Sequence, residues 1–409
     1  MTRHLIRSRG RLLAALTTCA LVLAGCGTSG HKEAATSAST PSPSASASTS
    51  GSAHGDGTHA RTAAVPVRHL PLRAGEHRQA VRMPTTYTPS APNGVGTDDY
   101  RCFLLDPRTT SDQMITGFNV LPGNPDVVHH VILFRVPPEQ VQEAEAKDAS
   151  TPGQGWTCFG DSGLGLGSGQ QIDDAPWLGA WAPGGKEQVY AKGYGEPFAA
   201  GSRVVMQVHY NLLAGQEPDR SAAELRLTPA SRAITPLVTQ LFPAPVELPC
   251  RPEHSDGRLC DRTAAVADVK ARFGQGPGST ADLLHLLCGA GKPGEVQSCT
   301  RPVNQAETIR GVAGHMHLLG KSIKVVVDQG RPDARTILDI PVWDFDNQGS
   351  RPIEPARLKP GDTVTVTCRH SQELRDRLPA FDGIPDKYVV WGEGTTDEMC
   401  LGILLVTRP

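Results

Sequence analysis

Histidine side chains that could bind a metal ion are concentrated in three short apolar runs. The first run, VVHHVILF, contains His129 and His130; the second, VVMQVHYN, contains His209; the third, GHMHLLG, contains His315 and His317. A single imidazole in an apolar run usually bonds to a neighbouring polar group. Five of them in three such runs favour a metal site, because neutral imidazole is the commonest metal ligand in proteins.

The spacing within these runs makes different demands on the backbone. His315 and His317 are two residues apart, so an extended strand directs both rings to one face. His129 and His130 are adjacent, and strict alternation would direct them to opposite faces. They share an ion only where the strand ends or twists, or through different ring nitrogens. His209 shares a strand face with Gln207, and we expect that amide to orient the ring.

A methionine near the carboxyl end of the chain adds a ligand of a different kind. Met399 lies in a short apolar segment that begins with Asp397 and Glu398. A methionine in such a segment is most often part of the core. Its thioether, however, is a soft ligand that favours Cu(I), whereas zinc in an exported hydrolase recruits a third histidine or a carboxylate. Two histidines with one methionine therefore indicate copper.

Short apolar runs separated by Gly, Pro, Asp and Asn surround these motifs. Runs of this length, rich in Val, Ile and Thr, predict an all-β fold. Residues 261–287 differ, since their Ala-rich and Leu-rich stretches predict a helical insertion that flanking cysteines hold by disulfides. A boundary near residues 231–236 divides the folded part into domains at 76–232 and 233–409. The expected strands include residues 127–136, 204–210, 309–317, 322–328, 363–368 and 388–391.

The amino-terminal segment predicts export and lipid anchoring. An arginine-rich start precedes an apolar stretch that is too short to cross a membrane, so residues 1–25 are expected to be a signal peptide. The stretch ends Leu-Ala-Gly-Cys, which resembles a bacterial lipobox and implies lipidation of Cys26. Residues 26–75, rich in Ser, Thr, Ala and Pro, predict a disordered tether. We therefore expect an extracytoplasmic protein on the outer face of a bacterial cell membrane, attached by its lipid alone.

Charge and cysteine content narrow the class of protein further. The 409 residues include 40 Lys and Arg against 42 Asp and Glu, a net charge of -2, which disfavours nucleic acid as a partner. Ten cysteines become eight when Cys19 and Cys26 are set aside. An even number in an exported chain predicts four disulfides.

The four motifs, taken in order, resemble a known family. VVHHVILF, MQVHYN, GHMHLLGKSI and GTTDEMC are similar to motifs of the copper type II, ascorbate-dependent monooxygenases, such as peptidylglycine α-hydroxylating monooxygenase and dopamine β-monooxygenase. The resemblance covers residues 100–401, apart from the helical insertion. Each motif alone is weak evidence for the family, whereas four motifs in the same order with comparable spacing are specific to it.

The resemblance implies a fold, a cofactor and a reaction. The fold is two tandem antiparallel jelly-roll β-sandwiches facing a solvent-filled cleft, and each sandwich holds one copper. The reaction is hydroxylation of a C–H bond of a small organic substrate with dioxygen, and ascorbate or another one-electron reductant supplies the electrons. The electron-transfer copper would be held by His129, His130 and His209, and the catalytic, oxygen-activating copper by His315, His317 and Met399. The family's disulfides match Cys102–Cys158 and Cys368–Cys400; Cys250, Cys260, Cys288 and Cys299 stay unassigned.

One departure from the family bears on the substrate. Peptidylglycine hydroxylases bind the substrate carboxylate with an arginine two residues before the HxH motif and with Asn and Tyr after the methionine. Ala313, Leu401 and Ile403 occupy those positions here. A peptide carboxylate would be left unpaired, which is costly in a closed site. Peptide amidation is therefore disfavoured, and the sequence leaves the substrate open.

Three other functions share some of these features. A non-catalytic copper-binding lipoprotein, which buffers or delivers the metal, needs the same six ligands but no substrate pocket. A β-sandwich adhesion module would use the histidines structurally. A zinc hydrolase lacks an obvious carboxylate base beside the HxH motif, and Met399 is a poor ligand for it.

Overall fold

The computed structural model describes residues 69–92, 96–165, 174–273 and 275–409. These residues belong to one compact unit that extends from Gly57 to Pro409. The expected signal peptide, the lipidation site Cys26 and most of the expected tether lie outside the described residues.

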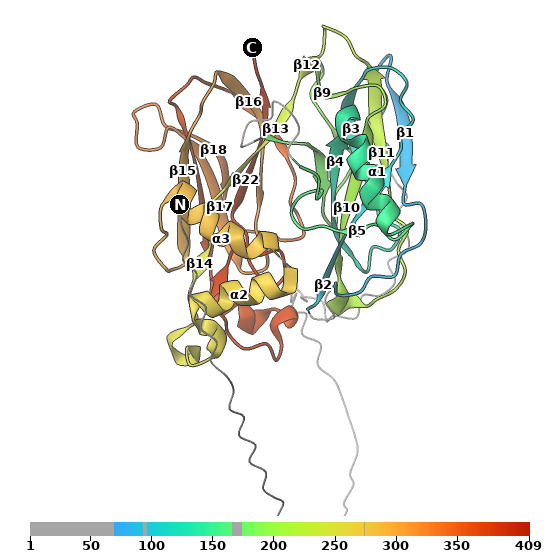
Figure 1. Cartoon of the computed structure of the whole chain (residues 1–409). Coiled ribbons are helices and arrows are strands. Elements are labelled where there is room, and N and C mark those ends of the chain that lie inside the picture. Colours follow the sequence, from blue (N-terminus) through green and yellow to red (C-terminus); the bar gives the residue numbers. More distant parts are fainter. Residues whose placement is uncertain (1–68, 93–95, 166–173, 274) are drawn as a thin grey trace, which may run out of the picture. The chain divides into compact units, whose positions relative to one another are not determined.

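The first half of the unit consists of two sheets that pack on a shared core. One sheet has the strand order β1-β11-β3-β9-β12, with β8 beside β3, and the other has the order β5-β2-β10-β4-β7 (Figure 1). Their core contains Ile115 and Phe118 from the first sheet and Leu133 and Met206 from the second. The strands are β1 (His77–Arg82), β2 (Asp98–Leu105), β3 (Gln113–Leu121), β4 (Val128–Val136), β5 (Trp156–Thr157), β7 (Trp177–Trp181), β8 (Gln188–Val189), β9 (Tyr194–Phe198), β10 (Arg203–Asn211), β11 (Ala222–Pro229) and β12 (Thr235–Pro236).

The second half repeats this plan with different strands. One sheet has the order β19-β16-β22-β13-β6 and the other β15-β20-β17-β18, while β14 and β21 form a short pair. Alternate residues of β16 and β22, such as Val312 and Leu404, are fully buried between the sheets. The strands are β6 (Asp174–Ala175), β13 (Val238–Pro243), β14 (Glu247–Leu248), β15 (Val296–Pro302), β16 (Glu307–His315), β17 (Gly320–Val327), β18 (Arg335–Ile340), β19 (Arg351–Leu358), β20 (Thr363–His370), β21 (Val389–Val390) and β22 (Leu401–Thr407).

Two short strands do not follow the expected division of the chain at residues 231–236. β6 precedes residues 231–236 in sequence but pairs with β13 of the second half, and β12 pairs in parallel with β9 of the first half. The fold is thus mostly β-sheet, as the apolar runs predict.

Helices occupy the expected insertion and one additional place. α2 (Arg262–Phe273) begins where the side chain of Asp261 accepts a hydrogen bond from the Ala264 amide, and α3 (Gln275–Cys288) follows it. The two helices pack together (Figure 1). α1 (Val141–Ser150) was not expected, because its mostly polar sequence has little helical periodicity. The short 3-10 helices are η1 (Pro138–Gln140), η2 (Leu212–Ala214), η3 (Pro252–His254), η4 (Arg258–Cys260), η5 (Gln372–Arg377) and η6 (Pro379–Phe381).

Four disulfides join the eight cysteines of the described residues. Two are the pairs that the resemblance implies, Cys102–Cys158 and Cys368–Cys400. The other two, Cys250–Cys260 and Cys288–Cys299, flank α2 and α3 and anchor the helical insertion. No helix of the described residues is long and apolar enough to cross a membrane.

Candidate metal centres and the cavity between them

Three imidazoles of the first half converge on one point. The Nδ1 atoms of His129, His130 and His209 lie 3.1 to 3.2 Å from one another. A neutral imidazole Nδ1 either donates or accepts a hydrogen bond, so three mutually close Nδ1 atoms cannot all be paired with one another. An ion above the centre of this triangle would instead meet each nitrogen at about 2 Å, the usual length of a metal–imidazole bond.

A β-bulge allows the adjacent histidines to share this point. In the pairing of β4 with β10, His209 lies opposite His130, and the next residue, Tyr210, lies opposite Val128. His129 is therefore an extra residue in β4, and the bulge turns its side chain out of strict alternation. The sequence alone indicates that two adjacent histidines should face opposite sides of a strand. The bulge that brings them together cannot be predicted from it, because it depends on pairing with β10, about 80 residues away.

Asp98 and Tyr100 hold the His209 ring. The Nε2 atom of His209 lies 2.8 Å from the carboxylate of Asp98, which leaves Nδ1 free to face the other two histidines. The Tyr100 ring stacks on His209 with 4.0 Å between centroids. The expectation that Gln207 orients this ring is wrong: its amide donates to the Asp161 carbonyl at 2.8 Å instead. The Asp98 carboxylate on the neighbouring strand β2 therefore contacts the His209 ring, whereas Gln207, on the same strand face as His209, does not bond to it.

The other candidate centre lies where β16 ends. β16 stops at His315, so His317 falls just beyond the strand rather than within it. The Nδ1 atom of His315 lies 2.6 Å from the Gln348 side-chain oxygen, and that of His317 lies 3.3 Å from the Asp397 carbonyl. Both rings therefore use Nδ1 for protein contacts and keep Nε2 available for a ligand. Their centroids are 5.1 Å apart.

The two acidic residues before Met399 fix the segment that carries it. Asp397 accepts two hydrogen bonds from Arg272 of α2, at 2.7 and 2.9 Å, and another from Lys387. It also accepts the Gly394 amide at 3.1 Å, and a Cβ at Gly394 would lie only 2.8 Å from the carboxylate, so the turn requires glycine. The helical insertion thus helps to place Met399.

Glu398 ties the same segment to the histidine motif. Its carboxylate accepts the backbone amides of His317 at 2.9 Å, Leu319 at 2.5 Å and Met399 at 3.1 Å. His370 lies 3.4 Å from the same carboxylate, and both side chains are fully buried. Because both carboxylate oxygens already accept hydrogen bonds, Glu398 holds the segment in place and does not act as a base.

Burial keeps His129, His130 and His315 in the neutral form that binds metal. Desolvation and the neighbouring histidines lower the pKa of His129 and His130 well below the usual value, and desolvation with His317 lowers the pKa of His315 to about 3. Burial alone would raise the pKa of Asp98, but hydrogen bonds from His209 and Thr395 outweigh it and lower that pKa to about 2. These three imidazoles are therefore neutral near neutral pH.

The two centres are close to each other. The rings of His130 and His315 are 6.1 Å apart between centroids, and Phe345 stacks on His129 at 4.6 Å. Asp98 also accepts hydrogen bonds from the amide and hydroxyl of Thr395, at 3.1 and 2.6 Å. At this end the first and second halves are in direct contact, whereas the family resemblance implies a solvent-filled cleft there.

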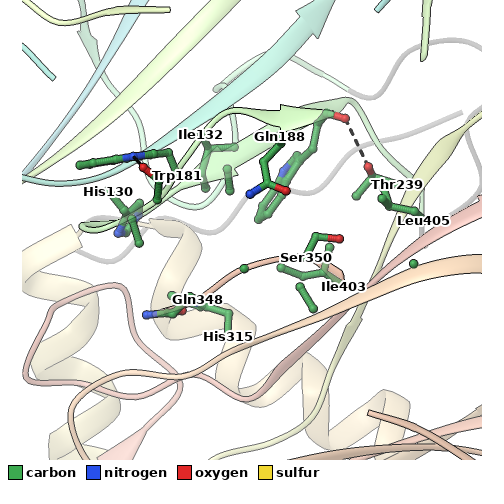
Figure 2. Close-up of a pocket in the computed structure, with 18 of the residues that line it drawn as sticks. His130, Ile132, Trp181, Gln188, Thr239, His315, Gln348, Ser350, Ile403 and Leu405 are labelled. Carbon is green, nitrogen blue, oxygen red and sulfur yellow. Dashed lines mark hydrogen bonds between the residues drawn. The ribbon is translucent and has the colours of Figure 1, made fainter. Parts of the chain in front are cut away.

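A cavity of about 1120 Å³ extends from the two centres between the halves. His130, Ile132 and Trp181 line one wall, and His315 and Ile403 line the other (Figure 2). Met399 and His317 line the same cavity. The structure therefore brings the five histidines and Met399 to one end of a space large enough for an organic molecule.

Sequence reasoning missed the residues that support these ligands. Asp98, Arg272, Phe345 and Gln348 lie in segments without a motif of their own. Asp397 and Glu398 adjoin Met399, and two acidic residues in an otherwise apolar segment were the one signal that could have drawn attention to them.

Comparison with known proteins does not assign a family. No protein-family model and no curated protein matches the chain. A xanthan lyase from Paenibacillus is 12% identical over 81% of this chain and 25% of the lyase, with a TM-score of 0.19, so the chain spans about a quarter of the lyase's length. Procruciferin, an 11S globulin from Brassica napus, is 12% identical over 81% of this chain and 85% of its own, with a TM-score of 0.15. An oxalate decarboxylase from Bacillus subtilis is 9% identical over 83% and 74%, with a TM-score of 0.15. TM-scores this low do not show a shared fold.

Proposed function

We propose that the chain is a copper-dependent monooxygenase with two tandem jelly-roll copper domains, anchored outside the bacterial cell by a lipid on Cys26. The observation that carries the proposal is the triangle of Nδ1 atoms from His129, His130 and His209, which adjoins a cavity lined by His315, His317 and Met399. One oxygen atom of dioxygen enters a substrate C–H bond, and the other leaves as water. Two electrons come from ascorbate or another one-electron reductant, and two protons come from solvent.

The donor atoms fit copper better than zinc. Three imidazoles at the first centre suit copper or zinc, whereas the thioether of Met399, which lines the cavity together with His315 and His317, favours Cu(I). The two carboxylates beside Met399 are not free to act as the base of a zinc hydrolase, because Asp397 is paired with Arg272 and Glu398 is bonded to three backbone amides. Copper, when bound, supplies the one-electron chemistry that lets dioxygen attack a C–H bond.

The protein's own groups orient the ligands and enclose the substrate. Asp98 holds His209 by Nε2, whereas Gln348 and the Asp397 carbonyl hold His315 and His317 by Nδ1. Phe345 covers the His129 ring. The mostly apolar walls of the cavity limit water near the reacting carbon.

Metal analysis with oxygen uptake tests the proposal. The purified chain, loaded with Cu(I) and freed of excess metal, should hold two coppers and consume dioxygen when ascorbate and a substrate are present. Two coppers without oxygen uptake across a substrate panel would favour a copper-buffering lipoprotein. A chain that binds no copper would overturn both functions.

A further inference from the structure

An apolar stripe leads from the second centre along the cavity. β16 and β22 pair so that His315 lies opposite Leu401, Ala313 opposite Ile403 and Gly311 opposite Leu405. All six of these residues line the cavity, while Val312 and Leu404, which lie between them on the two strands, are fully buried in the core. Figure 2 shows His130 and His315 at one end of the view and Leu405 at the other. The cavity wall is therefore elongated and apolar.

An arginine lies at the far end of this stripe. A β-bulge between Ile309 and Gly311 makes Arg310 an extra residue in β16, so it faces the cavity instead of the core. Its Nε donates to the Thr407 hydroxyl at 3.2 Å, and its guanidinium lies 5.1 Å from the Tyr194 ring centroid. Within the described part of the chain, no acceptor bonds to its two terminal amino groups.

Other cations along the cavity are engaged or solvated. Arg73 donates to the Tyr190 carbonyl at 2.6 Å and lies 3.7 Å from Glu76. Lys186 is exposed, so water already solvates its ammonium group. Arg310 combines a cavity position with an unused pair of donors, which is the geometry that binds a carboxylate through two parallel hydrogen bonds.

We propose that this cavity binds an elongated, mainly apolar organic carboxylate, whose chain lies along Leu401, Ile403 and Leu405 and whose carboxylate pairs with Arg310. His315 follows Arg310 by five residues in β16, which is about 16 Å at the usual rise per residue. The carbon presented to the second centre is therefore remote from the acid group. This inference rests on the proposed function for the reaction, but not for the binding itself.

Isothermal titration of the full chain carrying Cys26→Ser, with and without copper, tests the binding. The probes are dodecanoate and dodecanol, whose chains are equal in length and differ in the head group. We expect dodecanoate to bind at least about tenfold more tightly, and Arg310→Gln to remove that preference while leaving dodecanol unchanged. Decanoate should bind more weakly than dodecanoate by about fourfold for each methylene lost.

The matched control is Arg357→Gln, an exposed arginine of the neighbouring strand β19, which should keep the preference. If Arg310 only holds Tyr194, Arg310→Gln lowers the melting temperature but leaves the preference intact, and the proposal fails. Wild-type chain that binds the alcohol as tightly as the acid also overturns it, whether or not the variants fold. Both results are independent of copper content, so they are distinguishable from failure of the proposed function.

Discussion

Arg272 of the helical insertion donates two hydrogen bonds to the carboxylate of Asp397, two residues before Met399. Asp397 is almost fully buried, and its carboxylate also accepts hydrogen bonds from Lys387 and the Gly394 amide. The insertion is therefore coupled to the segment that carries Met399. Arg272 and Asp397 are 125 residues apart in the sequence.

Arg272→Gln tests this coupling. The substitution leaves a buried carboxylate with only part of its compensation, so we expect unfolding free energy to fall by about 3 kcal/mol. Cu(I) affinity at the His315 and His317 centre should fall as well, while the copper held by His129 stays. Asp268→Asn is the control, because it removes another partner of Arg272 and spares Asp397. Equal loss of both coppers would indicate general unfolding instead of a positioning role.

Asp98→Asn tests the support of the first centre. The carboxylate fixes the His209 ring with Nδ1 toward His129 and His130, and an amide favours the wrong tautomer or a rotated ring. We expect copper affinity at the first centre to fall about 10-fold to 100-fold, measured by competition with a Cu(I) chelator. His129→Ala should remove that copper completely and leave the second. Unchanged affinity in Asp98→Asn would show that the ring is held by Tyr100 alone.

The Cys368–Cys400 disulfide should contribute to stability beside Met399. Replacing both cysteines with alanine should lower the free energy of unfolding by about 2–5 kcal/mol, measured by urea denaturation. The Cys250–Cys260 pair, which closes a short loop outside the sheets, offers a comparison expected to cost less. A peptide map that shows Cys400 as a free thiol would contradict the pairing.

The pH dependence of the metal-free chain tests the burial of the imidazoles. Because the pKa of His315 is about 3 in the folded chain and 6.5 is the ordinary value, the unfolded chain binds a proton first as pH falls. The contribution of His315 to the free energy of unfolding is therefore complete above pH 6.5. It is lost as the pH falls from 6.5 toward 3, by about 1.4 kcal/mol per pH unit. His315→Gln should reduce the slope of unfolding free energy between about pH 6 and pH 5. His77→Gln, at an exposed position, should leave it unchanged.

The sequence allowed the strands and the histidine motifs to be predicted, but not the bulge and the side-chain contacts that position the histidines and Met399. The apolar run at residues 127–136 predicts β4, yet the bulge at His129 depends on pairing with β10. Gln207 was the nearest polar neighbour along the strand, whereas Asp98 comes from another strand. Arg272 belongs to an insertion that the resemblance to the copper monooxygenases does not cover. Contacts between segments far apart in sequence decided each of these cases.

X-ray absorption on the Cu(I)-loaded chain tests the central claim most directly, namely that Met399 completes a copper site with His315 and His317. Wild type should show a sulfur scatterer together with nitrogen ligands, and Met399→Leu should lose the sulfur while keeping its fold. That substitution nearly conserves volume, so it should cost less than about 1.5 kcal/mol of stability. Identical spectra for the two proteins would return Met399 to the core and contradict the monooxygenase account.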